Sequence, residues 1–295
     1  MSSNIYKNKK PLIFFLAPAF AFMLIFLYYP FVKNIFNSFC DIRGLGTAAR
    51  GLNTPWYANY SRMLSDENMR TALINTLIMI LVTIVGQVGI ALLLAILVDN
   101  VKHGAKFFRV VFFFPIVISA TALGLLFNLI FLYDKGMINQ LLGAMGVGKL
   151  TDWKDETHAL ITMMIPVTWQ YVGFYFIILV TGLNNISEEL YEAAAIDGAT
   201  RFQRVRFITL PLLYNVICTC IILAVTGALK VFDLPWVMFP KGIPFGKTWL
   251  TGTYMYYQVF NATDVDYSSA ISVLIVVLGV ILSKAVNKIF KERDY

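Results

Sequence analysis

The segment EAAAIDGATRFQRVRFITLP, residues 192–211, is a polar interruption in an apolar chain. It carries two acids and three arginines, yet long hydrophobic runs precede and follow it. The 295 residues are 58% hydrophobic and only 14% charged, with a mean hydropathy of +0.70. Soluble domains carry roughly 25% charged residues. This composition predicts an all-α polytopic membrane protein in which the segment is a structured loop.

Six stretches are long enough to cross a bilayer as helices, which takes about 20 mainly apolar residues. No stretch shows the two-residue alternation of a membrane β-barrel, and backbone groups in lipid must be satisfied internally, so we expect a helical bundle. The first stretch contains Pro18, is too long for a signal-peptide core and lacks a small-residue cleavage site, so we interpret it as a retained helix. The expected membrane domain covers 12–290, with helices at about 12–32, 72–98, 107–132, 158–183, 212–238 and 267–287.

The distribution of Lys and Arg favours an orientation with both termini in the cytoplasm. In that orientation the inside segments are short and pack their cations close to helix ends, at 7–10, 102–109, 201–206 and 284–293. The tails 1–11 and 291–295 would then be cytoplasmic. The net charge of +7 fits the anionic lipid of that face and requires no nucleic acid.

No catalytic or metal-ligating pattern stands out. Cys40, Cys218 and Cys220 lack metal-ligand spacing, and we interpret them as packing residues. The run GAMGVGKL at 143–150 nearly matches the phosphate-binding loop G-x-x-x-x-G-K-[ST], but Leu150 replaces the hydroxyl residue and no strand precedes the run. We expect a flexible loop there, and no catalytic residue, metal or cofactor bound by this chain.

Local signals predict two short helices in the loop at 185–211. Asn185 and Glu188 fit a capping box at the start of the first, whose run SEELYEAAAI is rich in helix formers. Gly198 is expected to end it in the left-handed conformation. Thr200 and Gln203 fit a second capping box, and the second helix is expected to continue to the proline at 211.

The same loop offers surfaces for contact. The alanines at 193–195 form a smooth face that another backbone can approach, and Arg201 and Arg204 share a face at i, i+3. A basic amphipathic element lying on lipid headgroups is the alternative interpretation.

The segment ELYEAAAIDGATRFQRVRFITLPLL resembles the EAA loop of permease subunits in ATP-binding-cassette (ABC) importers, with the pattern E-A-A-x-x-D-G-A followed by I-x-L-P. The stretches FRVVFFFPIVIS, GMINQLL, TWQYVGFYFIILVTGLNNI and KVFDLPWVMF are similar to the carbohydrate-importer branch in order and spacing. The resemblance therefore covers nearly the whole chain. One departure is FPKGIPFGKTW, which stands where that family has a T-G-G-G-P-like turn, so a particular substrate cannot be carried over.

The resemblance implies a type I ABC importer permease fold with the loop 185–211 as a cytoplasmic coupling helix. It implies no ATPase site in this chain, two ATPase subunits that hold ATP and Mg, a second, non-identical permease and an extracytoplasmic substrate-binding protein. The substrate would be a sugar or oligosaccharide and the location a bacterial cytoplasmic membrane. The coupling residues are expected to be Glu192, Ala193, Ala194, Asp197, Gly198, Ala199, Arg201 and Arg204.

Two runs supply candidate residues for a substrate pathway. Lys230 and Asp233 are charges inside the fifth run, at i, i+3 and near enough to pair; the alternative is a neutralised pair that snorkels to the outer interface. In the fourth run, WQYVGFYF gathers amide and aromatic groups that suit a sugar, although packing or an interfacial belt would also explain them. The predicted pathway residues are Gln170, Tyr171, Phe174, Lys230 and Asp233.

Two other classes of protein fit less well. A stand-alone secondary transporter or channel would favour internal repeats, and the two halves of the chain show no clear repeat. A membrane-embedded enzyme should carry catalytic groups inside the bilayer, where only Lys230 and Asp233 are candidates.

Overall fold

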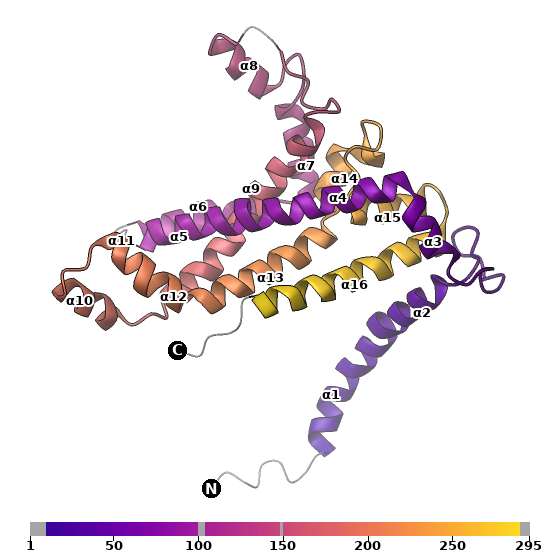
Figure 1. Ribbon diagram of the computed structural model, residues 1–295, viewed down its shortest axis with the longest axis horizontal. Helices are drawn as coiled ribbons and strands as arrows, with labels where there is room; N and C mark the ends of the chain where they lie inside the picture. The colour runs from indigo at the N-terminus through magenta and orange to yellow at the C-terminus, as the bar shows by residue number, and fades with distance from the viewer. Residues whose placement is uncertain (1–9, 100–103, 148–149, 290–295) are drawn as a thin grey trace. The chain divides into compact units, whose positions relative to one another are not determined.

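The computed structural model describes residues 10–99, 104–147 and 150–289, and it consists of helices joined by loops (Figure 1). Within these ranges there is no β-strand, only isolated bridges between Cys40 and Leu52 and between Arg43 and Asp264. The expected all-α class is confirmed. Of the predicted cytoplasmic tails, residues 1–9 and 291–295 lie outside the described residues, as does Lys102 of the second cation cluster.

Five helical segments are long and apolar enough to cross a membrane, and a bent pair of helices supplies a sixth. The second segment begins five residues before the expected position because the Asp66 side chain accepts hydrogen bonds from the backbone N–H groups of Asn68 and Met69 and so caps the helix. The segments are Leu12–Asn37, Glu67–Asp99, Ala159–Leu183, Tyr214–Met238 and Val265–Ile289, with the pair Ala105–Val117 and Ala120–Ile130.

The chain divides into two compact units. The first comprises residues 1–65 and 255–274. A polar network holds it together: Asn59 donates to the Ser38 carbonyl and to the Asp266 carboxylate, both at 3.1 Å, and Arg62 pairs with Asp264 at 2.6 Å. Its helices are α1 (Lys10–Met23), the π-helical η1 (Leu24–Tyr28), α2 (Tyr29–Asn37), α3 (Ala58–Ser65), the end of α15 (Thr251–Phe260) and the start of α16 (Val265–Ile289).

The second unit comprises residues 66–254 and 275–295 and contains the main hydrophobic core. Its first helices are α4 (Glu67–Val82), the π-helical η2 (Thr83–Gly89), α5 (Ile90–Asp99), α6 (Ala105–Val117), α7 (Ala120–Ile130), α8 (Met137–Ala144) and α9 (Ala159–Leu183). The next are α10 (Glu188–Ile196), α11 (Arg201–Arg204), the π-helical η3 (Val205–Thr209), α12 (Leu210–Leu212), α13 (Tyr214–Lys230), α14 (Asp233–Met238), the 3-10 turn η4 (Pro240–Gly242) and the remainders of α15 and α16.

Helix α9 is central to this core. Phe176 and Leu179 are fully buried, and on α4 and α5 Met79, Ala91 and Ala95 are equally inaccessible. The alanines let the helix backbones approach closely, which raises the number of dispersion contacts in a membrane protein that gains little from excluding water. This packing fixes which face of α9 is available for function.

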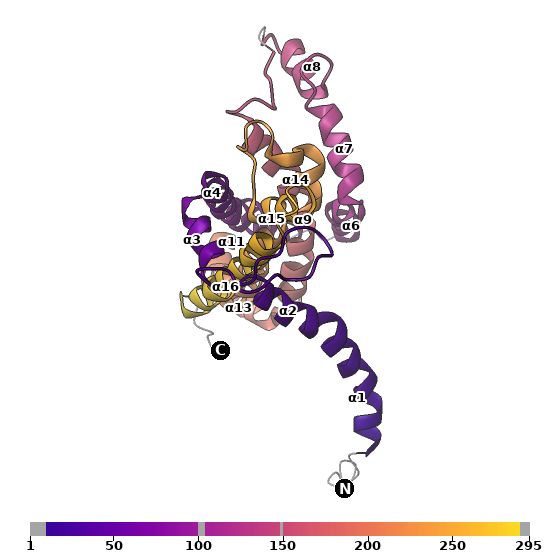
Figure 2. The ribbon, with the colours of Figure 1, turned by 90° about the vertical axis from the view of Figure 1, so that its right-hand side faces the viewer.

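The third predicted helix, 107–132, is not continuous. Helices α6 and α7 meet at an angle of 94°, with extended backbone at Ile118 and Ser119 between them. Pro115 lies in the last turn of α6, where proline cannot donate a backbone hydrogen bond. Figures 1 and 2 both show α7 leaving α6 steeply toward α8.

The fifth predicted helix, 212–238, is also interrupted. Helix α13 ends at Lys230, Val231 has an extended backbone with ψ at 127°, and α14 begins at Asp233. Pro235 explains the break, because a proline removes one hydrogen bond and its ring clashes with the carbonyl four residues earlier, here that of Val231. Lys230 and Asp233, expected at i, i+3 of one continuous helix, therefore lie on two separate helices.

The segment 239–249, FPKGIPFGKTW, folds into a tight turn around η4. Gly242 and Gly246 have φ of +68° and +77°, and Trp249 is buried against them. Asn75 of α4 donates to the backbone carbonyls of Lys247 and Trp249, at 2.7 and 2.9 Å. The turn that departs from the family pattern is thus anchored to the second membrane segment.

Candidate functional site: a cavity beside the helix break

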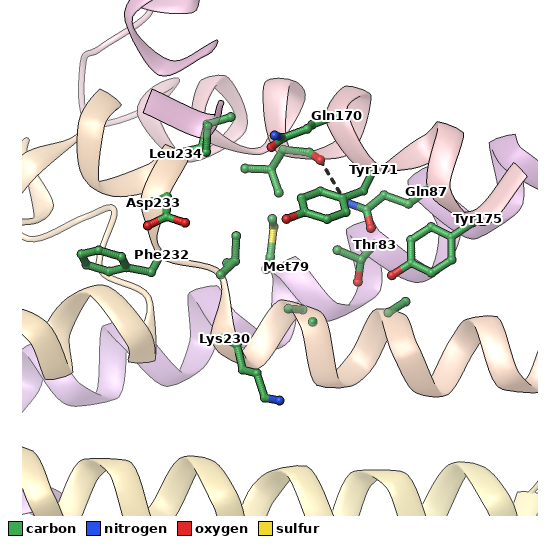
Figure 3. Close-up of a pocket in the computed structure, with 16 residues that line it drawn as sticks. Met79, Thr83, Gln87, Gln170, Tyr171, Tyr175, Lys230, Phe232, Asp233 and Leu234 are labelled. Carbon is green, nitrogen blue, oxygen red and sulfur yellow. Dashed lines mark hydrogen bonds between the residues drawn. The ribbon is translucent and has the colours of Figure 1, made fainter. Parts of the chain in front are cut away.

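A cavity of about 220 Å³ lies within the second unit, beside the break between α13 and α14 (Figure 3). Four membrane segments contribute to it, and its lining combines amides, hydroxyls and aromatic rings with small apolar groups. The side chains that give it chemical character are those of Met79, Thr83, Gln87, Gln170, Tyr171, Tyr175, Phe232 and Asp233.

Two buried glutamines form part of the wall. Gln87 in η2 donates from its amide nitrogen to the Val167 carbonyl at 3.0 Å, and Gln170 in α9 donates to the Ile118 carbonyl at 3.4 Å. The second bond satisfies a backbone carbonyl exposed by the bend between α6 and α7. Each amide nitrogen therefore serves the fold, while each side chain still has an oxygen that can accept a hydrogen bond.

The two tyrosines bring hydroxyl groups to the cavity. In Figure 3 the Tyr171 hydroxyl points to the middle of the cavity, and the Tyr175 hydroxyl lies near Thr83. Phe174, which was predicted to be a pathway residue together with Tyr171, does not line the cavity. Its ring packs edge-on against the Tyr175 ring, with 5.2 Å between centroids, and belongs to the apolar core.

Lys230 and Asp233 both line the cavity, but they do not pair. Within the described parts of the chain no ion pair joins them, and Figure 3 shows the Lys230 ammonium pointing away from the Asp233 carboxylate. The alternative interpretation, a mutually neutralised pair, is therefore not what the structure forms, and the exposed Asp233 carboxylate lies in the first turn of α14.

Sequence reasoning missed the contribution of the second membrane segment. Thr83 and Gln87 are spaced i, i+4 in a run that is otherwise apolar, a signal of a polar face inside the membrane. In the structure they lie in η2, where the wider π-helical turn is a common feature of functional sites.

The polar loop that precedes α13 forms the two expected helices, with one correction. Helix α10 starts at Glu188, and its N-cap is Ser187 rather than Asn185. The backbone N–H of Asn185 donates to the Gly182 carbonyl at 3.2 Å, so Asn185 closes the end of α9. The capping box predicted there is therefore wrong.

The remaining turn chemistry of the loop is confirmed. Gly198 has φ of +76°, and the N–H of Ala199 donates to the Ala194 carbonyl at 2.9 Å, which closes α10. Thr200 and Gln203 form a complete capping box at the start of α11. From there the chain stays helical through Pro211, with the π-helical segment η3 accommodating the proline.

The predicted coupling residues form an exposed surface. Helix α10 has no buried residue, and Glu192 and Ala193 are exposed. Two apolar side chains of the loop are also exposed to solvent, Ile196 at 86% and Phe202 at 74%. Ala194, Ala199 and Arg204 are partly buried, and Arg204 lines hollows on two sides of the loop.

The other sequence candidates carry no site in the described residues. No group of three or more His, Cys, Asp or Glu side chains among them could hold a metal, and the three cysteines are buried and form no disulfide. Of the run 143–150, residues 148 and 149 lie outside the described residues, so the flexible loop expected there stays a prediction; Gly146 has φ of +86° in the turn after α8.

The fold and the cavity define a multi-pass helical membrane protein with a polar site between its spans. The family model described as "Binding-protein-dependent transport system inner membrane component" matches residues 87–293. The probable ABC transporter permease YurN of Bacillus subtilis is 32% identical over 97% of this chain and 98% of its own length. The lactose transport permease LacF of Rhizobium radiobacter is 32% identical over 91% and 90%.

A solved bacterial alginate ABC transporter, in complex with an alginate-bound periplasmic protein, contains a chain with the same fold. Its TM-score is 0.84 at 20% identity, over 98% of both chains. This chain belongs to the binding-protein-dependent transport system inner membrane components, and it is an ABC transporter permease.

Proposed function

We propose that this chain is one permease subunit of a carbohydrate ABC importer and forms half of the pathway for a sugar or oligosaccharide. The observation that carries the proposal is the cavity lined by Gln87, Gln170, Tyr171 and Asp233 inside a permease of this family. Relatives are named for the transport of lactose, diacetylchitobiose and arabinooligosaccharides. Amide, carboxylate and phenol groups bind sugar hydroxyls, and aromatic rings pack on the C–H faces of a sugar.

The volume of the cavity supports a shared pathway. About 220 Å³ is below the range of roughly 300–1,000 Å³ that is usual for a site enclosing a whole small-molecule ligand. A second, non-identical permease would supply the other wall. An extracytoplasmic binding protein would deliver the substrate, as the alginate-bound periplasmic protein of the solved transporter suggests.

The loop 185–211 would transmit the action of two cytoplasmic ATPase subunits, which hold the ATP and Mg. Helix α10 is a short, rigid helix with an exposed alanine face, and the glycine turn and capping box fix its direction. Glu192, Arg201 and Arg204 provide charges for a partner. With the loop in the cytoplasm, both termini would also lie in the cytoplasm of a bacterium, and the chain would need no catalytic residue.

Reconstitution tests this function. The chain would be assembled in proteoliposomes with the partner permease, the ATPase and the binding protein encoded beside it, and uptake of a panel of radiolabelled mono- and oligosaccharides would be measured. We expect uptake of at least one saccharide that requires both ATP and the binding protein. Uptake by this chain alone, without ATPase or ATP, would instead establish a stand-alone transporter.

A further inference from the structure

A second polar pocket, of about 220 Å³, lies where the end of α5 meets the helices of the loop. Its lining includes Asp99 of α5, Tyr191 of α10 and Arg201 and Arg204 of α11. Figure 1 shows α11 beside the end of α5. Asp99 ends one membrane segment and Tyr214 begins another, so the pocket lies at the depth where lipid headgroups meet the protein.

The charge of this pocket is positive. Arg201 and Arg204 both line it, and Asp99 is the one acid among its lining residues. Arg109 of α6 is close enough to Asp99 to interact with it electrostatically. Within the described residues no ion pair joins Asp99 to either of the lining arginines. Among the described residues, three cations and one carboxylate thus leave a net positive charge at this pocket.

Hydrogen-bond donors in the pocket are also incompletely used. The Nε atom of Arg204 is buried and has no acceptor among the described residues. The Tyr191 hydroxyl lies 3.0 Å from the Thr209 hydroxyl, which donates to the Arg204 carbonyl at 3.5 Å, so these two hydroxyl groups are already paired. A buried donor without an acceptor is unfavourable, and guanidinium groups bind phosphate through two parallel hydrogen bonds.

We propose that this pocket binds the phosphate of an anionic phospholipid between α5 and the coupling loop. The lipid is favoured over free phosphate because two apolar side chains next in sequence to lining residues are exposed. Leu97, which follows Ile96 of α5, is 65% exposed, and Phe202, which follows Arg201 of α11, is 74% exposed. These side chains would contact acyl chains while the arginines hold the headgroup. Basic pockets at the ends of membrane helices bind lipid headgroups in this way.

Such a lipid would link a membrane segment to the loop. It would bridge α5 and α11. Its phosphate would also reduce the repulsion between the two arginines of α11. Lipid binding is a property of this chain by itself, so it can be measured without an ATPase and does not depend on the proposed transport function.

Native mass spectrometry of the purified, delipidated full chain tests the proposal, with phosphatidylglycerol and phosphatidylcholine added in separate titrations. We expect tighter binding of phosphatidylglycerol, and an affinity lower by about tenfold or more in the double variant Arg201→Gln/Arg204→Gln, because charge-assisted hydrogen bonds are lost. Arg206→Gln is the matched control, since Arg206 carries the same charge in the same loop, lies outside the pocket and should leave the affinity unchanged.

Equal binding by the double variant and the wild type, or an equal loss in Arg206→Gln, would overturn the proposal. Displacement of the lipid by millimolar inorganic phosphate would assign the pocket to the free anion instead. Should the double variant fail to fold, Arg201→Lys/Arg204→Lys keeps both charges but loses the bidentate geometry. Its affinity for phosphatidylglycerol is expected to fall several-fold, and an undiminished affinity would refute the role of the guanidinium groups.

Discussion

Gly173 of α9 packs directly against the backbone of Phe112 in α6: a Cβ atom at position 173 would lie 1.8 Å from the Phe112 carbonyl oxygen. Because the obstacle is backbone, no change of side-chain rotamer can relieve it. The crossing of α6 and α9 therefore depends on glycine, and the same crossing positions Gln170 and Tyr171 at the cavity three and two residues away.

Gly173→Ala is expected to destabilise the protein. Overpacking of a close helix contact usually costs about 1–3 kcal/mol, and we expect the upper end of that range here because α6 and α9 must separate. The apparent melting temperature in detergent measures the effect. Gly143→Ala in α8 is the control, since no atom lies within 4 Å of its added methyl group. A melting temperature that changes equally in both variants would contradict the proposed contact.

Gly198→Val is expected to uncouple ATP hydrolysis from transport. The left-handed φ of +76° is unfavourable for a β-branched residue, so the turn between α10 and α11 should change its direction. No neighbouring atom obstructs the side chain, so the effect comes from the backbone alone. Uptake should be lost in the reconstituted complex while membrane insertion is retained.

Gly146→Val is the control for this variant. It introduces the same residue at a φ of +86°, also in open space, in the turn after α8. Uptake should persist in it. Normal ATP-driven uptake by Gly198→Val would show that the direction of α10 does not matter for coupling.

Tyr171→Phe removes one hydroxyl from the cavity and keeps the ring. A neutral hydrogen bond contributes about 0.5–1.5 kcal/mol, so we expect the maximal rate of saccharide uptake to fall about two- to tenfold. Tyr133→Phe, at a half-exposed tyrosine outside the cavity, should transport normally. Identical rates for wild type and Tyr171→Phe would remove Tyr171 from the pathway.

Asp155 should make stability depend on acid pH. Its pKa lies below the ordinary value of 3.8, chiefly because the backbone N–H of His158 donates to its carboxylate, at 2.7 Å. A depressed pKa means that the carboxylate stabilises the folded state above 3.8 and loses this contribution as the pH falls through the folded-state value.

The difference in melting temperature between the wild type and Asp155→Asn should therefore be constant near neutral pH and shrink below a pH of 3.8. Asp152→Asn is the matched control, because the Asp152 carboxylate accepts one backbone hydrogen bond, from Lys154, in the same loop. If the difference in melting temperature between the wild type and Asp155→Asn stays constant on acidification, the Asp155 carboxylate is not the cause of the pH dependence.

Local signals in the sequence were sufficient to predict most of the helix ends and turns in the loop 185–211. The Gly198 turn and the capping box of Thr200 and Gln203 depend on residues within one helical turn of each other, so a pattern reveals them. The Asn185 cap failed because Asn185 belongs to the turn that closes α9, and Ser187 takes the N-cap position of α10.

The cavity could be predicted only in part. Apolarity identified the membrane segments, but breaks at Ile118 and at Val231 interrupt two of them. The second break separates Lys230 and Asp233, a pair that one continuous helix would bring together. Gln87 joins Gln170 through contacts between distant parts of the chain. Phe174 faces the core because the contact at Gly173 sets the rotation of α9 about its own axis. That rotation cannot be predicted from a single sequence.

The two glutamines of the cavity and Asp233 provide hydrogen-bond acceptors for a guest. Each glutamine nitrogen donates one of its two hydrogens to a backbone carbonyl, that of Val167 or Ile118, while both amide oxygens and the Asp233 carboxylate can accept. A guest pairs with these acceptors through its O–H groups. A methylated sugar, unchanged in ring shape and oxygen count but stripped of its O–H groups, should pass this permease poorly.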